Sequence, residues 1–328
     1  MTETIRFPHL HITLNHVGQY FNLFGFHVAF YGCVIALGMI LGVMMILHEA
    51  KRTGQSEDNY LDIAIWTLIF SVIGARIYYV VFAWDLYKDN LLSVFNIRQG
   101  GLAIYGGVLA GILTAFIICK IKKMPFLLVA DTCIIGLPIG QMLGRWGNFF
   151  NREAFGGYTD SLFAMQIPLD AVRQEGAVTQ EMMEHLKTIK GVEYISVHPT
   201  FLYESLWSLG VFLLLFFMRK HVRFHGQQFL TYLVAYGAGR FWIEGLRTDQ
   251  LFLTGTSIPV SQLLAAIMVV FGIIMLIVGN RRAAVSGNEP QEEAADKTAE
   301  TVAGEMTESG AEKESPADKK DEDDSDNL

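Results

Sequence analysis

The sequence predicts an all-α protein that crosses a membrane about seven times, and three observations support this fold class. Of the 328 residues, 52% are hydrophobic, and the mean hydropathy is positive, which is more apolar than a water-soluble domain of this size usually is. Seven stretches approach the roughly 20 apolar residues that a spanning helix needs. Short basic loops follow every second stretch, as expected of a chain that crosses a membrane repeatedly.

The seven predicted spans are separated by short polar connections, and a few of them carry charged residues. They comprise approximately residues 24–47, 61–84, 102–119, 126–143, 201–218, 228–245 and 258–278.

The basic loops also predict how the chain is oriented, because lysine and arginine beside a spanning helix are retained on the cytoplasmic side. Four connections agree, and they hold Lys51, Arg52, Lys120, Lys122, Lys123, Arg219, Lys220, Arg223, Arg281 and Arg282. We therefore expect the N-terminus outside and the C-terminus in the cytoplasm.

Two further regions complete the predicted domain organisation. Residues 145–199 lie outside in this topology, and a connection this long is expected to build a small polar head of mixed structure. The formal net charge of −8 is concentrated at the end of the chain, where residues 289–328 hold 15 acidic residues and 4 lysines, leaving 18 acidic and 21 basic residues before them. We expect a transmembrane domain over residues 1–283 and a disordered acidic tail over residues 284–328.

The cysteines give no sign of a metal site or a disulfide framework. Cys33, Cys119 and Cys133 all lie in apolar stretches without the spacing of zinc ligands. We expect them to be buried as small hydrophobic side chains, with neither a metal nor another cofactor bound by the protein.

Charged residues at membrane depth are the first candidates for function, because each costs several kcal/mol unless it has a partner, a wet cavity or a chemical role. Asp62 begins a helix at its cytoplasmic end, where it favours the helix dipole. The charged set comprises Asp62, Arg76, Asp131, Arg145, Glu204, Arg240, Glu244 and Arg247.

The sixth predicted helix carries a polar stripe. Tyr236, Arg240, Glu244 and Arg247 are spaced by four, four and three residues, which places them on one helical face. A salt-bridge ladder that fixes helix packing would give the same spacing. Two arginines against one carboxylate leave a positive surplus, however, and such a surplus at the outer membrane boundary suits a phosphate group.

The end of the fourth predicted helix, GRWGNFFNREAFG at residues 144–156, combines arginines, amides, a carboxylate and glycines. An arginine fork matches phosphate oxygens, and glycine permits close backbone approach. A glycine-capped helix with snorkelling arginines would also fit, but it would not require the amides of Asn148 and Asn151. Asp131 lies 14 residues before Arg145, about 21 Å along a straight helix, so we do not expect it to be the direct counter-ion.

Two more segments contain candidate residues. Residues 100–111 open the third predicted helix with small residues around Tyr105, a pattern more typical of close packing than of catalysis. Residues 198–205 open the fifth, with Pro199 suited to a first turn and Glu204 one turn further. A buried carboxylate such as Glu204 calls for a partner or a function.

Taken together, these segments resemble the prolipoprotein diacylglyceryl transferase family. GRWGNFFNREAFG fits the family signature of Gly-Arg-x-Gly-Asn-Phe, an apolar residue, Asn-x-Glu, two free positions and Gly. GARIYYVVF, RQGGLAIYGG, HPTFLYES and GRFWIEGLRTD are similar to its other blocks, in the same order and spacing, over roughly residues 20–280.

The resemblance implies a transferase of the bacterial plasma membrane that acts in lipoprotein maturation. Such enzymes move diacylglycerol from phosphatidylglycerol to the lipobox cysteine thiol of a prolipoprotein signal peptide and release glycerol phosphate. It also implies membrane lipids as partners, no nucleic acid, and no metal or triad, because the substrate supplies the nucleophile. By position, Arg145 would bind the lipid phosphate and Arg240 would be the second essential arginine. The other family positions fall on Asn148, Asn151, Glu153, Gly156, Glu204, Tyr236, Glu244 and Arg247, with Arg76 in the GARIYYVVF block.

Two positions depart from the pattern. Some family members carry a histidine, a candidate general base, where Tyr105 stands. Tyrosine is a poor base at neutral pH, so we expect Tyr105 to orient the thiol or the phosphate by hydrogen bonding, while Glu204 or water accepts the proton. Phe201 stands where relatives have glutamine.

Two other functions would share some of these features. A transporter or scramblase for anionic lipids also uses intramembrane arginines and broken helices, but it predicts inverted repeats, which the two halves do not show. A structural scaffold predicts balanced charge on the sixth helix rather than a surplus.

Overall fold

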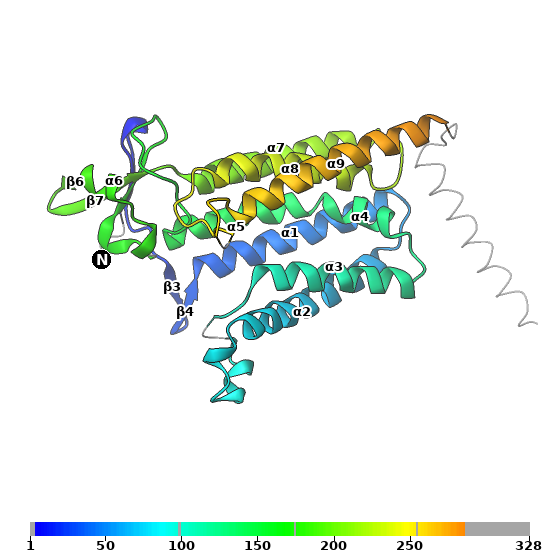
Figure 1. The fold of residues 1–328 in the computed structure, drawn as a ribbon, viewed down its shortest axis with the longest axis horizontal. Coiled ribbons are helices and arrows are strands. Elements are labelled where there is room, and N and C mark those ends of the chain that lie inside the picture. Colours follow the sequence, from blue (N-terminus) through cyan, green and yellow to red (C-terminus); the bar gives the residue numbers. More distant parts are fainter. Residues whose placement is uncertain (1–3, 98–99, 174, 254, 286–328) are drawn as a thin grey trace, which may run out of the picture.

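The fold is a bundle of long helices with a small sheet at one end, and the computed structural model describes residues 4–97, 100–173, 175–253 and 255–285 (Figure 1). The predicted acidic tail lies almost entirely outside the described residues. The helices are α1 (Phe30–Arg52), α2 (Glu57–Phe82), α3 (Ile104–Ile121), α4 (Phe126–Ile134), α5 (Leu137–Asn151), α6 (Gln180–Glu184), α7 (Thr200–Met218), α8 (Gln227–Glu244) and α9 (Val260–Val285).

The helices confirm the polytopic all-α prediction, although the count of seven spans is not confirmed. Within the described residues, α1, α2, α3, α7 and α9 are long and apolar enough to cross a membrane, and α4 with α5 makes a sixth candidate if the bent pair is one span. The polar side chains within α8, among them Arg240 and Glu244, keep this 18-residue helix out of that set.

The predicted single span over residues 126–143 is broken in the structure. α4 and α5 meet at an angle of 44°, and Pro138 stands in the first turn of α5. Proline has no N–H to donate back into a preceding turn, so it begins a helix more readily than it continues one. α5 then runs on to Asn151, eight residues beyond the predicted end of the span.

The glycines of the third predicted span serve close packing, as expected. α2 and α3 lie side by side (Figure 1), and a Cβ atom added at Gly74 of α2 would lie 2.9 Å from the Gly106 carbonyl oxygen of α3. Such an approach leaves no room for a side chain at this crossing.

The sheet at the end of the bundle is built from two distant parts of the chain. Its five strands run in the order β2-β1-β5-β7-β6, with every pair antiparallel, and Arg6 of β1 pairs with Gln166 of β5. The strands are β1 (Ile5–Phe7), β2 (Ile12–Leu14), β5 (Met165–Pro168), β6 (Lys187–Ile189) and β7 (Val192–Val197), and β3 (Tyr20–Leu23) with β4 (Phe26–Ala29) forms a separate hairpin before α1.

The predicted head over residues 145–199 is therefore mixed in structure, but its boundaries differ. Residues 145–151 belong to α5, and the N-terminal strands add one edge of the sheet. Its core joins Ile5, Ile167, Ile195 and Val197 to Phe149 of α5 and Phe201 of α7. This shared core fixes the head against the ends of α5 and α7, which is where the charged residues gather.

Candidate functional site

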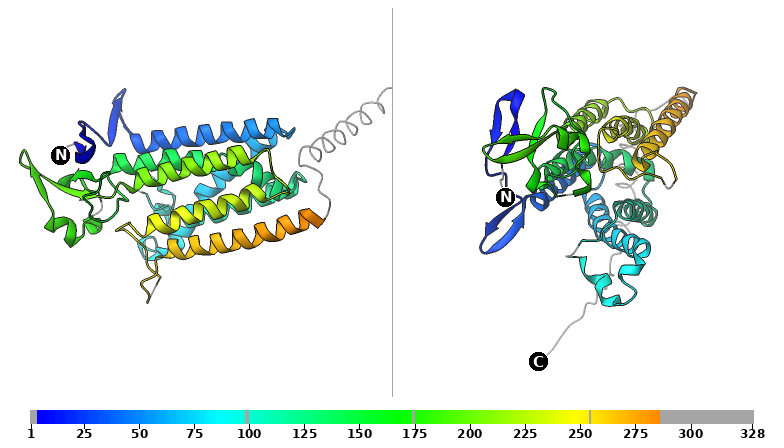
Figure 2. Two further views of the ribbon diagram at one scale, coloured as in Figure 1. Left: turned by 90° about the horizontal axis from the view of Figure 1, so that it is seen from above. Right: turned by 60° about the vertical axis from the view of Figure 1, so that its left-hand side comes forward.

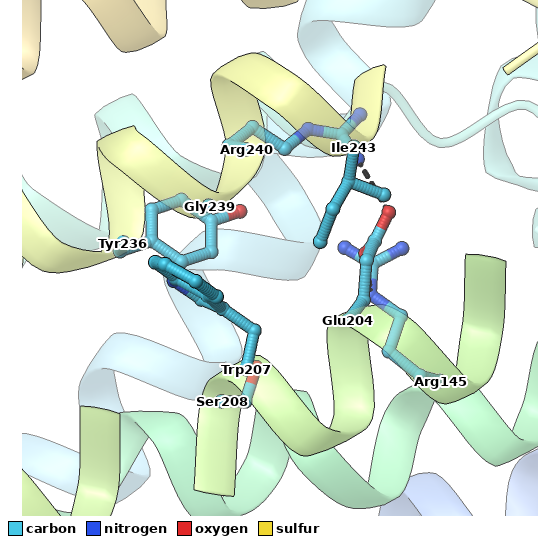
Figure 3. Close-up of a pocket in the computed structure, with 8 residues that line it drawn as sticks. All are labelled: Arg145, Glu204, Trp207, Ser208, Tyr236, Gly239, Arg240 and Ile243. Carbon is cyan, nitrogen blue, oxygen red and sulfur yellow. Dashed lines mark hydrogen bonds and ion pairs between the residues drawn. The ribbon is translucent and has the colours of Figure 1, made fainter. Parts of the chain in front are cut away.

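Three helices each bring one charged side chain to one site (Figure 3). The site lies at the head end of the bundle, where α5 ends and α7 begins. Arg145 comes from α5, Glu204 from the first turns of α7 and Arg240 from the last turns of α8. Arg145 pairs through Nε with Glu204 Oε2, and Arg240 donates from a terminal nitrogen to Glu204 Oε1 at 2.8 Å. One carboxylate thus bridges two arginines from different helices.

The cluster continues past the end of α8. Arg240 lies 2.5 Å from Glu244, and Arg247 binds Asp249 with two hydrogen bonds of 2.9 and 2.7 Å. A terminal nitrogen of Arg247 is also 3.8 Å from Glu204. The prediction that Arg247 shares a helical face with Arg240 is wrong, because α8 ends at Glu244 and Arg247 lies in the following turn.

The predicted positive surplus is also corrected. Among the described residues, three arginines meet three carboxylates, because Glu204 and Asp249 join Glu244. Helical spacing within α8 could not reveal Glu204, which arrives from α7. The cluster therefore has no net formal charge, but its side chains are not equally buried. Arg145 and Arg240 are 24% and 17% exposed, and Glu204 is 8% exposed.

At the rim of the cluster, Arg247 stabilises the charged form of its neighbour. Burial opposes ionisation of the Asp249 carboxyl, but the hydrogen bonds and the charge of Arg247 outweigh it, so the pKa of Asp249 lies below its usual value. The Arg247–Asp249 pair therefore stays ionised throughout the neutral range.

A small cavity adjoins the two bridged arginines. Its lining includes Arg145, Glu204, Arg240 and Tyr236 (Figure 3), and its volume of about 10 Å³ is close to the space of one water molecule. Glu204 fills the position between the guanidinium groups. A larger anion would have to take its place or part the helices.

Tyr236 is positioned by ring stacking on Tyr232, which in turn is hydrogen-bonded to Gln141. Its ring lies parallel to that of Tyr232, with centroids 5.3 Å apart, and Gln141 of α5 donates to the Tyr232 hydroxyl at 2.7 Å. The spacing of Tyr232 and Tyr236 by four places both on one face of α8. Neither Gln141 nor Tyr232 has a pattern in the sequence that marks it as part of the site.

The other residues of the 144–156 motif brace the turn that leaves α5. Asn148 and Asn151 each donate to Glu153 at 3.1 Å, and Arg173 lies 3.7 Å from the same carboxylate. No hydrogen bond or ion pair joins them to Arg145 in the described part of the chain. The amides thus shape the loop around a carboxylate.

Gly156 joins this turn to the end of α8. Its N–H donates to the His198 carbonyl at 3.0 Å, and it forms an isolated bridge with Arg247. A Cβ atom there would lie 2.8 Å from both His198 Cβ and the Leu246 carbonyl oxygen. Only glycine lets the three segments meet.

Arg76 lies outside the cluster. It is buried on α2 and donates five hydrogen bonds of 2.7 to 3.2 Å to the backbone carbonyls of Ser93, Val94, Asn96, Gly100 and Gly101. These bonds use the full donor capacity of a guanidinium group. Arg76 therefore secures the connection between α2 and α3 and has no donor left for a ligand.

Tyr105 lies half-buried in the first turn of α3. Within the described residues, no hydrogen bond or ion pair joins it to Arg145, Glu204 or Arg240. Its predicted role in orienting a substrate stays a prediction.

Asp131 and Asp62 have structural partners. Asp131 accepts from Gly226 N–H at 2.5 Å and Phe229 N–H at 2.9 Å, and so caps the start of α8 from α4. Asp62 pairs with Lys122 at 2.7 Å. Both carboxylates are therefore bound by partners other than Arg145, in line with the distance argument for Asp131.

Comparison with known proteins places most of the chain in one family. The sequence model of the prolipoprotein diacylglyceryl transferases matches residues 19–278. A phosphatidylglycerol–prolipoprotein diacylglyceryl transferase of Clostridioides difficile is 44% identical over 254 residues, which are 77% of this chain and 92% of that protein. Proteins of the same name from Finegoldia magna and Clostridium perfringens are 41% and 40% identical over 258 and 260 residues, covering 93% and 92% of their own lengths.

Proposed function

Because the chain belongs to the prolipoprotein diacylglyceryl transferase family, we propose that the cluster of Arg145, Glu204 and Arg240 is where its lipid donor reacts. The protein is a multi-pass membrane transferase that moves a diacylglyceryl group from phosphatidylglycerol to a prolipoprotein. The observation that carries the proposal is the bridge by which Glu204 of α7 joins arginines from α5 and α8.

The acceptor in this proposal is the thiol of a lipobox cysteine in the signal peptide. Its sulfur attacks the glycerol carbon that carries the phosphate ester, so that a C–S bond forms as the C–O bond to phosphate breaks. The thiol proton passes to a base, and glycerol phosphate leaves with the bonding electron pair. The catalyst must therefore stabilise negative charge on the departing phosphate.

Arg145 and Arg240 suit that task because both already hold an anionic group between them. A phosphate that replaces Glu204 would receive two charge-assisted donors from opposite sides. The displaced carboxylate of Glu204 would then be free to accept the thiol proton. Glu204 thus occupies the phosphate position between the two arginines before the donor binds, and it acts as the base afterwards.

The remaining residues take supporting roles in this proposal. Glu244 holds Arg240 and lies 4.0 Å from Arg247 at the rim of the cluster, and Tyr236 lines the cavity. Asn148, Asn151, Glu153 and Gly156 shape the turn that presents Arg145, and Tyr105 orients the thiol or the phosphate from α3. We assign Arg76 to loop structure, because its donors are taken by carbonyl groups.

The head lies on the outer side of the membrane in this proposal, since the basic ends of α1, α3, α7 and α9 lie at the opposite end of the bundle (Figure 2). Prolipoproteins would then be modified where their signal peptides emerge. The C-terminus would face the cytoplasm.

The direct test combines purified protein, phosphatidylglycerol and a synthetic lipobox peptide, with product mass as the readout. We expect the peptide to gain one diacylglyceryl group through a thioether. The same peptide with its cysteine replaced by serine is the control and should stay unmodified. Failure to modify the cysteine peptide, or equal modification of the serine peptide, would contradict the proposal.

A further inference from the structure

A long apolar groove runs along the outside of the bundle between α7 and α8. Its volume is about 440 Å³, within the range of about 300–1,000 Å³ typical of sites for small organic ligands. The α7 wall consists of Tyr203, Leu206, Trp207, Gly210, Val211 and Leu214. Ala235 and Trp242 form the α8 wall.

The groove begins at the level of the charged cluster and continues away from the head. Tyr203 precedes Glu204, and the lining residues up to Leu214 recur at intervals of three and one, which is one straight face of a helix. Trp207 lines both the groove and the small cavity beside Arg145 and Arg240. The small cavity and the apolar groove thus adjoin each other at the indole ring of Trp207.

Trp207 is fixed in that position by its neighbours. Its indole N–H donates to the Ala235 carbonyl at 2.9 Å, and its ring meets Trp242 edge-on, with centroids 6.2 Å apart. A Cβ atom at Gly239 would overlap the indole. Contacts with α8 therefore fix the Trp207 ring of α7 where the small cavity adjoins the groove.

The dimensions of the groove indicate its occupant. From Tyr203 to Leu214 the helix rises by about 16 Å, which is about half of the roughly 30 Å hydrocarbon core of a bilayer. That is the depth of one leaflet, and so of one lipid acyl chain.

We propose that this groove holds one acyl chain of the lipid donor while its phosphate is bound by Arg145 and Arg240. The inference rests on the proposed function and adds the place where the hydrophobic part of the donor lies. The groove then orients the glycerol carbon toward the thiol, and its length determines which acyl chains react well.

Gly210 offers a clean test, because a Cβ atom there has nothing within 4 Å. It lies seven residues, or about 10 Å, beyond Tyr203, close to the reach of an extended chain of eight carbons. Gly210→Phe should block longer chains there and leave short chains in place. Gly210→Ala is the mild variant that retains an open groove.

The measurement is kcat/KM with phosphatidylglycerol carrying two 16-carbon or two 8-carbon chains. Since misplacing a substrate by about 1 Å can cost on the order of 100-fold in rate, we expect Gly210→Phe to lower the 16-carbon value at least about tenfold. The 8-carbon value should fall much less, and Gly210→Ala should lower the 16-carbon value less than Gly210→Phe does. Gly32→Phe is the matched control, because Gly32 of α1 is equally open and lies outside the groove.

The outcomes separate the two proposals. No thioether product from the unmodified protein with either lipid would overturn the proposed function itself. An active enzyme whose ratio of 16-carbon to 8-carbon activity is unchanged by Gly210→Phe would overturn the groove assignment alone. A rise in KM for the peptide, with the lipid KM unchanged, would assign the groove to the signal peptide and overturn it too.

Discussion

Two arginine environments in this protein differ in the kind of group that binds the positive charge. Arg76 is 7% exposed and is bound by five backbone carbonyl oxygens, which belong to a folded loop and cannot leave without unfolding it. Arg145 and Arg240 are bound by carboxylate side chains beside a cavity, and a rotating side chain can yield its place to another anion. In the proposed mechanism, an arginine is therefore structural or reactive according to whether its partners can be exchanged.

The largest effect that this comparison predicts follows from Arg145→Gln. The variant keeps a terminal amide but shortens the side chain and removes the charge, so kcat/KM should fall about 100- to 1,000-fold, the usual cost of one preorganised donor to a developing anion. Kinetics with phosphatidylglycerol and a lipobox peptide check it.

Arg173→Gln is the matched control, because Arg173 is 54% exposed and lies 3.7 Å from Glu153. Its kcat/KM should stay within about threefold, as expected for a surface ion pair. If both variants lost the same activity, Arg145 would have no special part in the reaction.

A second prediction concerns the shared carboxylate. Glu204→Gln leaves two partly exposed arginines without their bridge, which should lower the free energy of unfolding by about 3 kcal/mol, the low end of the range for a buried pair. Added inorganic phosphate should recover part of the loss by occupying the vacated position, and thermal unfolding with and without phosphate measures this. Equal phosphate responses in the variant and the unmodified protein would show that phosphate does not exchange with Glu204.

The contrasting prediction is for Arg76→Lys. Lysine has three donors in place of five, so the connection between α2 and α3 should open more often and be cleaved faster in limited proteolysis. Activity per folded molecule should stay within about threefold. A loss of kcat/KM as large as that of Arg145→Gln, with proteolysis unchanged, would reverse the assignment of the two environments.

The smallest effect is expected at the rim of the cluster. The pKa of Asp249 is lowered in the folded protein, so its ionised form stabilises the fold. This stabilisation is complete above the ordinary aspartate pKa of about 3.9. It is lost as the pH falls through the lowered pKa of the folded protein. Asp249→Asn should therefore cost about 1 kcal/mol near neutral pH and nothing once the carboxyl is protonated. Unfolding of both proteins across that pH range checks the sign, and a difference that persisted in acid would contradict it.

Sequence patterns predicted the parts of the site that lie close together along the chain. Helical spacing related Tyr236, Arg240 and Glu244, and the cost of intramembrane charge singled out Arg145 and Glu204. The pairing of Glu204 with both arginines escaped prediction, because spacing within one helix says nothing about its neighbours. This is why the sequence suggested a positive surplus where the structure has charge balance.

In the fold, too, local elements were predicted from the sequence, whereas contacts between distant segments were not. Apolar runs predicted most long helices to within a few residues, but hydropathy did not register the break before Pro138. Nor did it register that residues 5–14 complete a sheet with residues 165–197. Trp207 was missed since an aromatic residue in an apolar helix has no distinctive local pattern, and only the approach of α8 gives it a role.

The pairing of Arg6 with Gln166 also has a consequence for biosynthesis. Strand β1 leaves the ribosome before α1, but its partner β5 follows only after α1 to α5 have been made. The cost of closing so long a loop rises only slowly with its length, by about 0.6 kcal/mol per doubling, so the delay is a matter of order in time more than of final stability. Until β5 has been made, one edge of β1 is unpaired. The sheet can be completed only after α1 to α5 have been inserted with β1 and β5 on the same side of the bilayer.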